Sequence, residues 1–427
     1  MPKKILAIAY HYPPIHRSSG VHRTVNFVRY LPGYGWDPSV LTVHPRAYEE
    51  ADTGVTGDNQ PPAPVHRAFA LDTRRHLSIK GRYAKFMSIP DRWVSWWLGA
   101  IPSGLSMIRR NRPDIIWSTY PIATSHLIAL TLHKLTGIPW VADFRDPMTD
   151  DDYPTDPTVK KVFQWIEKKV IQHCSRAVFT TPDTLELYVR RFPEINRSNF
   201  SVINNGYDDI SFREAEQSLQ ERPRPPAREG QMVFVHSGTL YRSERNPEPF
   251  FSALAELHKE RFISPATLKV ILRASSDETY YHGRLKQLGL ECIVSLEPPV
   301  PYAEALREML SVDGLLLLQA ANCNHQIPAK AYEYIRSARP VLTLTDHAGN
   351  TASLMKEAGY DTIADIESKE NIKKTLITFI NGIRQGESKT PGAETIAAYS
   401  RQQKTAELAA VLDSIVSAQA SLAANKP

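Results

Sequence analysis

Short apolar runs alternate along the chain with longer stretches in which apolar residues recur at helical spacing. The short runs lie at residues 4–10, 38–43, 114–120, 139–144, 177–182, 200–205, 232–238, 268–274, 292–297, 314–319 and 340–345. Continuous apolar runs separated by helices are typical of parallel strands that are buried on both faces. The pattern therefore predicts an α/β protein with two doubly wound, Rossmann-like domains.

The boundary between the two domains is predicted from a polar, proline-bearing stretch without periodicity. It separates an N-terminal domain over residues 1–210 from a C-terminal domain over residues 232–390, with a linker at 211–231. Residues 391–427 are alanine-rich and predict a C-terminal helix. One arrangement for this helix is to pack back on the N-terminal domain.

Charge and cysteine content narrow the class of protein. The net charge of +5 is too small to indicate nucleic acid, but it suits anionic substrates or an anionic membrane surface. Cys174, Cys292 and Cys323 are scattered and form neither a disulfide framework nor a zinc spacing. The first apolar run is too short for a secretory signal, and no run is long enough to span a membrane. We expect a cytoplasmic protein, either free or peripheral at the inner face of the membrane.

Ligands of parallel sheets bind beyond the carboxyl ends of the strands, so residues after the apolar runs are candidates for a site. Ser18, Ser19 and Gly20 follow the first run and precede a helical stretch with Arg23. Glycine permits close backbone approach, and a helix N-terminus offers amides to an anion. The alternative is a turn with a capping serine. The glycine pattern of a dinucleotide site, G-x-G-x-x-G, does not follow this strand.

Acidic residues follow the run at 139–144. Asp146 stands at the strand end, where a site residue is expected, and Asp150, Asp151 and Asp152 come shortly after it. The three aspartates suit either a solvated loop or a metal site, because hard cations prefer carboxylate oxygens. Two doubly wound halves disfavour the single-domain, metal-dependent transferases that use such a motif. We therefore expect no metal.

Two stretches of the second half combine a strand end with basic side chains. Gly238 ends one strand and is followed by Arg242 and Arg245, whose guanidinium groups suit a diphosphate. Lys330 lies near the start of a helix, and Glu333 falls on the same face of it. The lysine could meet phosphate, and the carboxylate could accept hydrogen bonds from ribose hydroxyls. The alternatives are solvated surface arginines and an i,i+3 charge pair.

Residues 82–110 interleave tryptophans with arginines. Trp93, Trp96 and Trp97 lie between Arg92 and a later pair of arginines. Such a stretch could lie on an anionic bilayer or bind a lipid-linked acceptor. The alternative is that tryptophans at helical spacing belong to the core.

In these motifs the chain resembles the retaining GT-B glycosyltransferases of family four, the group-one transferases, of the type that builds bacterial surface polysaccharides. The resemblance runs through the Gly20 loop, "DIIWSTYP" (114–121), "WVADFRDP" (140–147), "NNGYD" (204–208), "HSGTLYRSERNP" (236–247) and "IPAKAYEYIRSARPVL" (327–342). It implies two Rossmann-like domains that face an interdomain cleft. The C-terminal domain would hold a nucleotide-diphospho-sugar and the N-terminal domain the acceptor.

The resemblance also implies roles for single residues. In this family two glutamates eight positions apart mark the donor site; the second matches Glu333, and His325 occupies the place of the first. Gly20, Gly238, Arg242, Arg245 and Lys330 would help to bind the donor. Arg23, Trp96 and Trp97 would lie on the acceptor side. Asp146 and His325 are the candidates near the reacting sugar.

The expected function is a metal-independent hexosyltransferase without a cofactor. It would move a sugar, most simply from a UDP-sugar, to a glycan or a lipid-linked acceptor in polysaccharide biosynthesis. One alternative is a sugar-nucleotide epimerase of the same fold, which needs no acceptor. The other is a non-catalytic partner that binds nucleotide sugars, which His325 in the glutamate position would suit.

Overall fold

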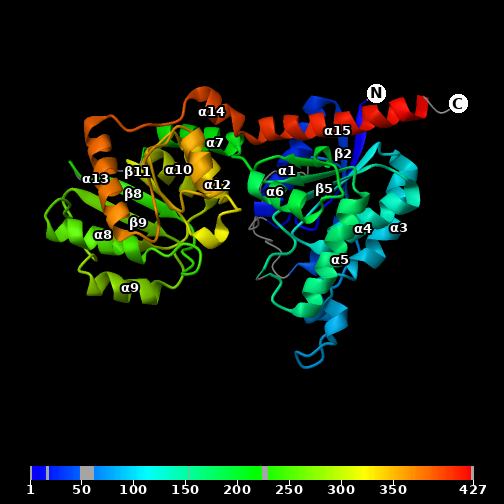
Figure 1. The fold of residues 1–427 in the computed structure, drawn as a ribbon, viewed down its shortest axis with the longest axis horizontal. Helices are drawn as coiled ribbons and strands as arrows, with labels where there is room; N and C mark the ends of the chain where they lie inside the picture. Colours follow the sequence, from blue (N-terminus) through cyan, green and yellow to red (C-terminus); the bar gives the residue numbers. More distant parts are fainter. Residues whose placement is uncertain (1, 16–18, 49–61, 152, 224–228, 425–427) are drawn as a thin grey trace. The chain divides into compact units, whose positions relative to one another are not determined.

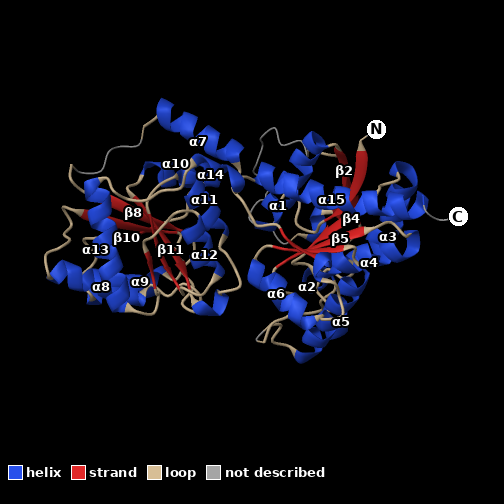
Figure 2. Cartoon of the chain, turned by 45° about the horizontal axis from the view of Figure 1, so that its top comes forward, coloured by secondary structure: helices blue, strands red, loops and turns tan. Residues whose placement is uncertain are grey.

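The chain forms two compact units, which are described separately. A computed structural model describes residues 2–15, 19–48, 62–151, 153–223 and 229–424 (Figure 1). Unit 1 comprises residues 1–205 and 401–427, and unit 2 comprises residues 206–400. In both units the strands form a central sheet with helices packed against it (Figure 2).

Unit 1 is built on a seven-stranded parallel sheet of order β3-β2-β1-β4-β5-β6-β7. Its strands are β1 (Lys3–Ile8), β2 (Trp36–Val43), β3 (Val65–Ala68), β4 (Ile115–Thr119), β5 (Trp140–Arg145), β6 (Arg176–Phe179) and β7 (Phe200–Val202). Its helices are α1 (Ser19–Tyr30), α2 (Thr73–His76), α3 (Trp96–Asn111), α4 (Ala123–Thr136), α5 (Pro157–His173), α6 (Pro182–Arg191) and α15 (Arg401–Ala424).

The sheet of unit 1 is apolar on both faces, because alternate side chains of each strand enter different cores. Leu6 and Ile8 of β1 pack in the core that contains residues of α3, α4 and α5. Ile5 and Ala7 pack on the other face, in the core that contains residues of α1 and α15. This two-sided burial explains why the strands read as continuous apolar runs.

Unit 2 repeats this plan with a six-stranded parallel sheet of order β10-β9-β8-β11-β12-β13. Its strands are β8 (Met232–Ser237), β9 (Leu268–Arg273), β10 (Val294–Glu297), β11 (Gly314–Gln319), β12 (Val341–Thr345) and β13 (Ile363–Ala364). Its helices are α7 (Asp209–Glu221), α8 (Glu248–Lys259), α9 (Glu278–Gln287), α10 (Tyr302–Ser311), α11 (Ala329–Ser337), α12 (Asn350–Glu357), α13 (Lys369–Gln385) and α14 (Ala393–Ala398). The prediction of two doubly wound α/β domains is confirmed.

Strands β3 and β13 are absent from the apolar runs that predicted the other strands. Both lie at an edge of their sheet and are only four and two residues long. In β3 only Ala68 is buried, and polar His66 and Arg67 stand in its middle. Short edge strands carry too few buried positions to leave a hydrophobic pattern.

The expectation of an irregular linker at residues 211–231 is wrong over its first half, where most of α7 lies. Only Phe212 and Ala215 of this helix are buried, so its apolar stripe is too thin to stand out in the sequence. Arg336 of α11 holds it through hydrogen-bonded ion pairs with Asp209 and Glu216. Residues 224–228 of the expected linker lie outside the described residues.

The expected C-terminal helix consists of two helices, α14 and α15, in different units. Leu408, Leu412 and Ile415 of α15 enter the core beside Phe27 and Leu31, and Trp36 Nε1 donates to Asp413 Oδ1 at 2.9 Å. In Figure 1, α15 (red) lies along unit 1. Across the described ranges, none of the helices combines the length and the apolar character that a membrane crossing requires.

Candidate active site

In unit 2 a group of charged side chains collects at the carboxyl ends of β8 and β11. Gly238 follows β8 with a φ of +119°, a conformation that L side chains rarely adopt. A Cβ at this position would lie 2.8 Å from Nζ of Lys330. The glycine therefore lets the lysine of α11 approach the backbone at the end of β8.

Lys330 lies in the first turn of α11, and its Nζ is 3.3 Å from Nε2 of buried His236. The other ring nitrogen of His236, Nδ1, is 2.9 Å from the Leu316 carbonyl oxygen. Because a carbonyl only accepts hydrogen bonds, we assign the ring hydrogen to Nδ1. Nε2 of this neutral imidazole then accepts from the Lys330 ammonium and positions it.

The charge on Lys330 is disfavoured in the ligand-free protein. Desolvation by the surrounding protein, followed by repulsion from Arg245, lowers the pKa of Lys330 to about 7, although Glu333 opposes the shift. Burial, followed by the nearby Lys330 charge, lowers the pKa of His236 well below its usual range. Two cations are thus held beside a helix N-terminus, where an anion would relieve their repulsion.

Arg245 and Glu333 are held by separate contacts. Arg245 donates from Nη1 to the Thr239 carbonyl oxygen at 3.1 Å, and its guanidinium lies 5.3 Å from the ring centre of Tyr241. Glu333, one turn after Lys330, accepts a hydrogen bond from the Tyr302 hydroxyl at 2.8 Å. Gly238, Arg245, Lys330 and Glu333, four of the predicted donor residues, therefore form one group with His236.

Arg242 and His325 have other surroundings. Arg242 is exposed, forms an ion pair with Asp277 and lies 4.0 Å from the ring centre of Tyr280. Arg242 is thus a surface arginine, which is the alternative that the sequence left open, and its guanidinium is engaged by Asp277. His325 lies in the loop before α11, with Nε2 3.4 Å from Gln326 Nε2.

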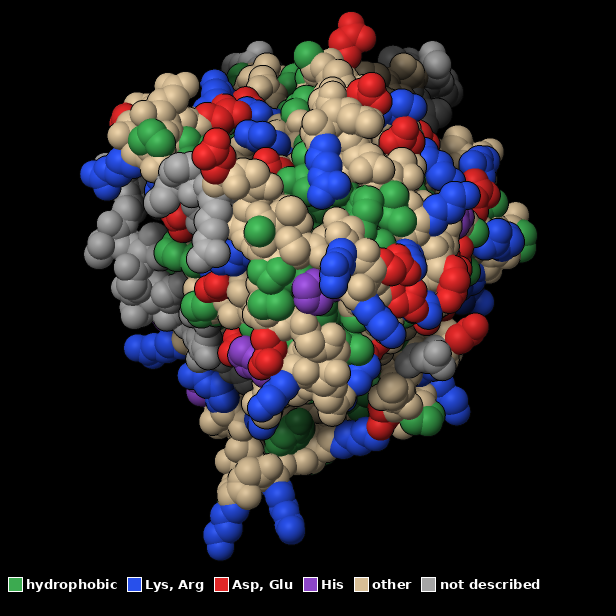
Figure 3. All heavy atoms as spheres, turned by 90° about the vertical axis from the view of Figure 1, so that its left-hand side faces the viewer, with side chains coloured by type: hydrophobic (Ala, Val, Ile, Leu, Met, Phe, Trp, Pro, Cys, Tyr) green, Lys and Arg blue, Asp and Glu red, His purple; other side chains and the backbone are tan. Residues whose placement is uncertain are grey.

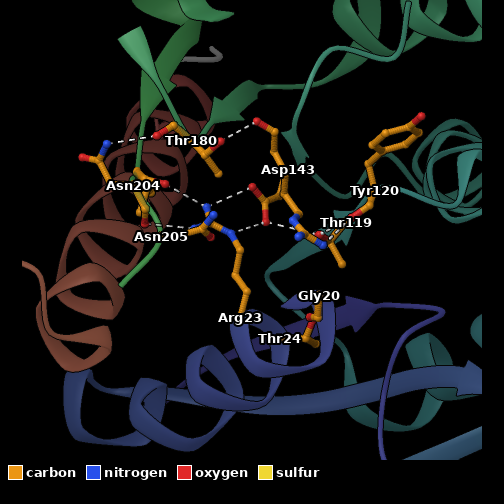
Figure 4. Close-up of polar contacts among 11 residues, drawn as sticks. Gly20, Arg23, Thr24, Thr119, Tyr120, Asp143, Thr180, Asn204 and Asn205 are labelled. Atoms are coloured by element: carbon orange, nitrogen blue, oxygen red, sulfur yellow. Dashed lines mark hydrogen bonds and ion pairs between the residues drawn. The ribbon is translucent and has the colours of Figure 1, made fainter. Parts of the chain in front are cut away.

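Arg23 of α1 is part of a buried ion pair in unit 1, shown in Figure 4. Its Nε and Nη2 donate to the two carboxylate oxygens of Asp143 at 2.9 and 3.1 Å. It also donates to the carbonyl oxygens of Ile203 and Asn204, both at 3.0 Å. The expectation that Arg23 contacts an acceptor is wrong, because these bonds use the guanidinium to join α1, β5 and the chain after β7.

A narrow depression lies at the carboxyl ends of β1, β4 and β5. Tyr10, His11, Gly20, Thr119, Tyr120, Ile122 and Arg145 line it. Burial, with a smaller contribution from Arg145, lowers the pKa of His11 to about 4, so this imidazole is neutral at physiological pH. Gly20 belongs to the first turn of α1, and its carbonyl oxygen accepts from Thr24 Oγ1 at 3.0 Å.

Backbone strain marks the same end of β5. Arg145 has a φ of +63°, and the pairing of β5 with β6 shifts register between Asp143 and Arg145. Such strain in a residue other than glycine often accompanies a functional site. Half-buried Asp146 follows directly, and its charge acts on Arg145 and Tyr120. The predicted position of Asp146 at a strand end agrees with the structure, and its role stays a prediction.

The acidic loop after Asp146 is held by contacts with α5 and α6: Thr149 Oγ1 donates to Glu167 Oε2 at 3.1 Å, and Met148 N donates to the Tyr188 hydroxyl at 3.1 Å. Asp150 and Tyr153 pair through their backbones, at 2.8 Å in one direction and 3.3 Å in the other. Asp152 lies outside the described residues. Within the described ranges, no three His, Cys, Asp or Glu side chains are grouped as a metal site would need.

The tryptophans of α3 differ in their exposure. Trp96 is completely buried in the core against the sheet. Trp97 is half-buried and donates from Nε1 to Thr131 Oγ1 of α4 at 3.0 Å. The expectation that Trp96 faces an acceptor or a membrane is wrong, because its side of α3 packs inward.

Sequence reasoning missed two residues of the group in unit 2. His236 is the single titratable side chain in the apolar run at 232–238, and that interruption was an available signal. Tyr302 opens α10, 31 positions before the Glu333 carboxylate that it contacts. Only the tertiary fold brings Tyr302 and Glu333 together, so local sequence pattern could not indicate this pair.

Comparisons with known proteins agree with this architecture. Residues 19–206 match the model of the family described as "Glycosyl transferase 4-like domain". No protein with a curated description matches the chain in sequence. Sucrose-phosphate synthase from Thermosynechococcus elongatus is similar in structure, with a TM-score of 0.66 and 12% identity over 97% of this chain and 100% of that one.

Two further solved structures are similar over nearly their whole length. HepE from Anabaena, in complex with UDP, has a TM-score of 0.59 and 13% identity over 99% of this chain and 100% of that one. The α,α-trehalose 6-phosphate synthase from Burkholderia multivorans has a TM-score of 0.66 and 10% identity over 100% of this chain and 99% of that one. At such low identity these likenesses establish the fold, which is GT-B. With the match over residues 19–206, the predicted enzyme class, a glycosyltransferase, is confirmed.

Proposed function

We propose that the chain is a retaining, metal-independent transferase that moves a sugar from a UDP-sugar to a glycan or lipid-linked acceptor in polysaccharide biosynthesis. The observation that carries this proposal is the pair of cations, Lys330 and Arg245, held beside Gly238 at the start of α11. Two cations and a helix N-terminus suit a diphosphate, which is the charged part of a nucleotide sugar.

The same group would also assist the reaction. As the bond between sugar and diphosphate breaks, negative charge grows on the leaving oxygen. Lys330, Arg245 and the amides of α11 would stabilise that charge without rearranging, since they are already in place. In this way protein cations would perform the task that a divalent ion performs in metal-dependent transferases. The sugar-bearing carbon would become oxocarbenium-like.

Glu333 would bind the ribose of the donor. Its carboxylate is oriented by the Tyr302 hydroxyl and lies one helical turn from Lys330. A carboxylate in this position can accept hydrogen bonds from two adjacent hydroxyls, while the lysine meets the phosphates. Support for uracil as the base comes from HepE, whose solved structures hold UDP and UDP-glucose.

We propose that Asp146 and His325 contact the sugar. Asp146, beside the strained end of β5, would orient the sugar or the acceptor hydroxyl. His325, in the loop before α11, would contact the sugar in place of the glutamate that the resemblance implies. With the Glu333 carboxylate assigned to the ribose, retention would follow from attack by the acceptor on the side that the diphosphate leaves. A peripheral position at the inner face of the membrane would suit a lipid-linked acceptor.

Calorimetric titration of UDP and of uridine tests the diphosphate assignment. Arg245→Ala and Lys330→Ala should each weaken UDP binding by roughly ten- to a hundredfold, because each removes a charge-assisted contact to phosphate. Both variants should bind uridine as the parent does. Arg242→Ala is the matched control, because this arginine of the same loop already pairs with Asp277 and should be dispensable.

Equal losses for UDP and uridine would show that Arg245 and Lys330 support the fold instead. Product analysis then separates the remaining functions. Conversion of one UDP-sugar into its epimer in the absence of any acceptor would identify an epimerase. Tight donor binding with no turnover on any acceptor would favour a non-catalytic partner.

A further inference from the structure

A hairpin projects from unit 1 between α2 and α3. Ile79 and Arg82 exchange backbone hydrogen bonds of 2.8 and 3.0 Å across a tight turn, in which Lys80 and Gly81 have φ values of +50° and +74°. Every residue from 79 to 86 is exposed. In Figure 1 this segment, in light blue, extends beyond α5 at the bottom of the picture. We call residues 79–86 the tip.

The tip exposes large apolar side chains to solvent. Ile79 and Phe86 are 80% and 76% exposed, and Tyr83 is also exposed. Each would gain free energy by leaving water, and monomeric proteins seldom leave contiguous apolar surface uncovered without a function. The tight turn holds these side chains at the end of a projection, where no other described part of unit 1 covers them.

An apolar groove continues from the base of the tip. It has a volume of about 790 Å³ and is lined by residues of α3, α4 and α5 together with Leu77 and Met87, which flank the tip in sequence. Leu98, Leu135 and Trp165 line it and are themselves largely exposed. Lys134 is the single charged residue in its lining. Tip and groove therefore form one continuous apolar surface.

The segment that carries the tip has charged residues of one sign. Residues 73–90 contain no Asp or Glu but include Arg74, Arg75, Lys80, Arg82 and Lys85. Lys85 forms an ion pair with Asp156, whereas Lys80 and Arg82 are exposed at the turn itself. Basic side chains (blue) also end the lowest projection in Figure 3. Cations beside exposed apolar groups complement an anionic bilayer, whose headgroups are negative and whose interior is apolar.

We propose that the tip and the groove dock unit 1 on an anionic lipid membrane. Ile79, Tyr83 and Phe86 enter the interface, and Lys80 and Arg82 contact the headgroups. Leu98 and Trp165, which are exposed at the groove, add apolar area to this docking surface. This goes beyond sugar transfer, because docking needs neither donor nor acceptor. It also replaces the membrane role predicted for Trp96, which is buried.

Co-sedimentation of the full chain with vesicles tests this proposal. One vesicle preparation contains phosphatidylcholine alone, and the other contains one quarter phosphatidylglycerol. The chain should bind the anionic vesicles, and the binding should weaken as added salt screens the charges. Ile79→Ser with Phe86→Ser should weaken binding at least ~10-fold, given the free energy of burying two large apolar side chains.

Charge-reversing variants separate the cations of the tip from net charge. Lys80→Glu with Arg82→Glu should abolish the preference for phosphatidylglycerol. Lys259→Glu with Lys286→Glu is the matched control, because these lysines are exposed on unit 2 and the net charge changes equally. All three double variants should keep the parent melting temperature, since exposed side chains contribute little to stability.

Either of two results would overturn the proposal: no vesicle binding by the parent chain, or unchanged binding by both tip variants. A third result would assign the surface to a protein contact instead. That result is a concentration-dependent dimer in sedimentation velocity that Ile79→Ser with Phe86→Ser dissolves, in a chain that ignores vesicles.

Discussion

Lys330 is a cation in a place that disfavours its charge. Protein atoms replace its water, Arg245 repels it, and His236 offers a neutral lone pair at 3.3 Å. Half of the Lys330 side chains should therefore be neutral near pH 7 in the ligand-free protein. A diphosphate would reverse this balance, because it raises the pKa of the ammonium that it contacts. Donor binding and protonation of one lysine are then linked.

This linkage predicts that donor affinity falls as pH rises above about 7. Below that pH Lys330 is already charged, whereas above it the complex must take up a proton, which costs up to about tenfold in affinity per pH unit. UDP-glucose suits the measurement, because its diphosphate does not titrate in this range. Calorimetry at several pH values should show the decline in the parent chain.

Lys330→Ala provides the control for this pH dependence. The variant should bind UDP-glucose more weakly, with an affinity that stays flat over the same range. A decline of equal slope in the variant would place the titrating group elsewhere than on Lys330.

At the scale of elements, α3 shows how one helix separates two functions by its faces. Trp96 points into the core, and Leu98, two positions later, is exposed beside the apolar groove. Residues two apart on a helix do not share a face. The spacing of the tryptophans alone could not show which face of α3 points into the core. Apolar residues stand on both faces of this helix, as Trp96 and Leu98 show.

Trp96→Ala should destabilise unit 1 by about 3–5 kcal/mol, since it leaves a large cavity in a packed core. The melting transition should fall by several degrees. Leu98→Ser is the control on the same helix and should leave the transition within experimental error. An unchanged transition in Trp96→Ala would contradict the burial of this indole, and differential scanning calorimetry makes the comparison.

For the whole molecule, the cations of unit 2 bear on the need for a metal. With Lys330 and Arg245 at the diphosphate, the proposed transfer should proceed in excess EDTA at close to its full rate. A radiolabelled-donor assay with and without chelator measures this. Inactivation by EDTA and rescue by Mn²⁺ would instead direct attention to Asp150 and its acidic neighbours.

Much of the architecture could be predicted because it has local causes. A strand buried on both faces is apolar at most of its positions, so β1, β4, β5, β8, β11 and β12 are visible as runs. Parallel strands require crossovers, which the intervening helical stretches supply. Lys330 and Glu333 could also be chosen as candidates from the sequence, since a helix that follows a buried strand starts at the ligand-binding edge of the sheet.

The tertiary structure decided which polar side chains form sites and which hold the fold. Arg23 and Asp143 are 120 positions apart. The sequence around an arginine does not show whether its guanidinium joins three segments of the fold or binds a ligand. His236 and Lys330 meet only because β8 and β11 are neighbours in the sheet. The exposure of Ile79, Tyr83 and Phe86 at the tip, likewise, depends on the fact that no other described segment packs over them. Hydrophobic pattern reports the burial that a segment can accept, whereas the packing of distant segments determines where that burial occurs.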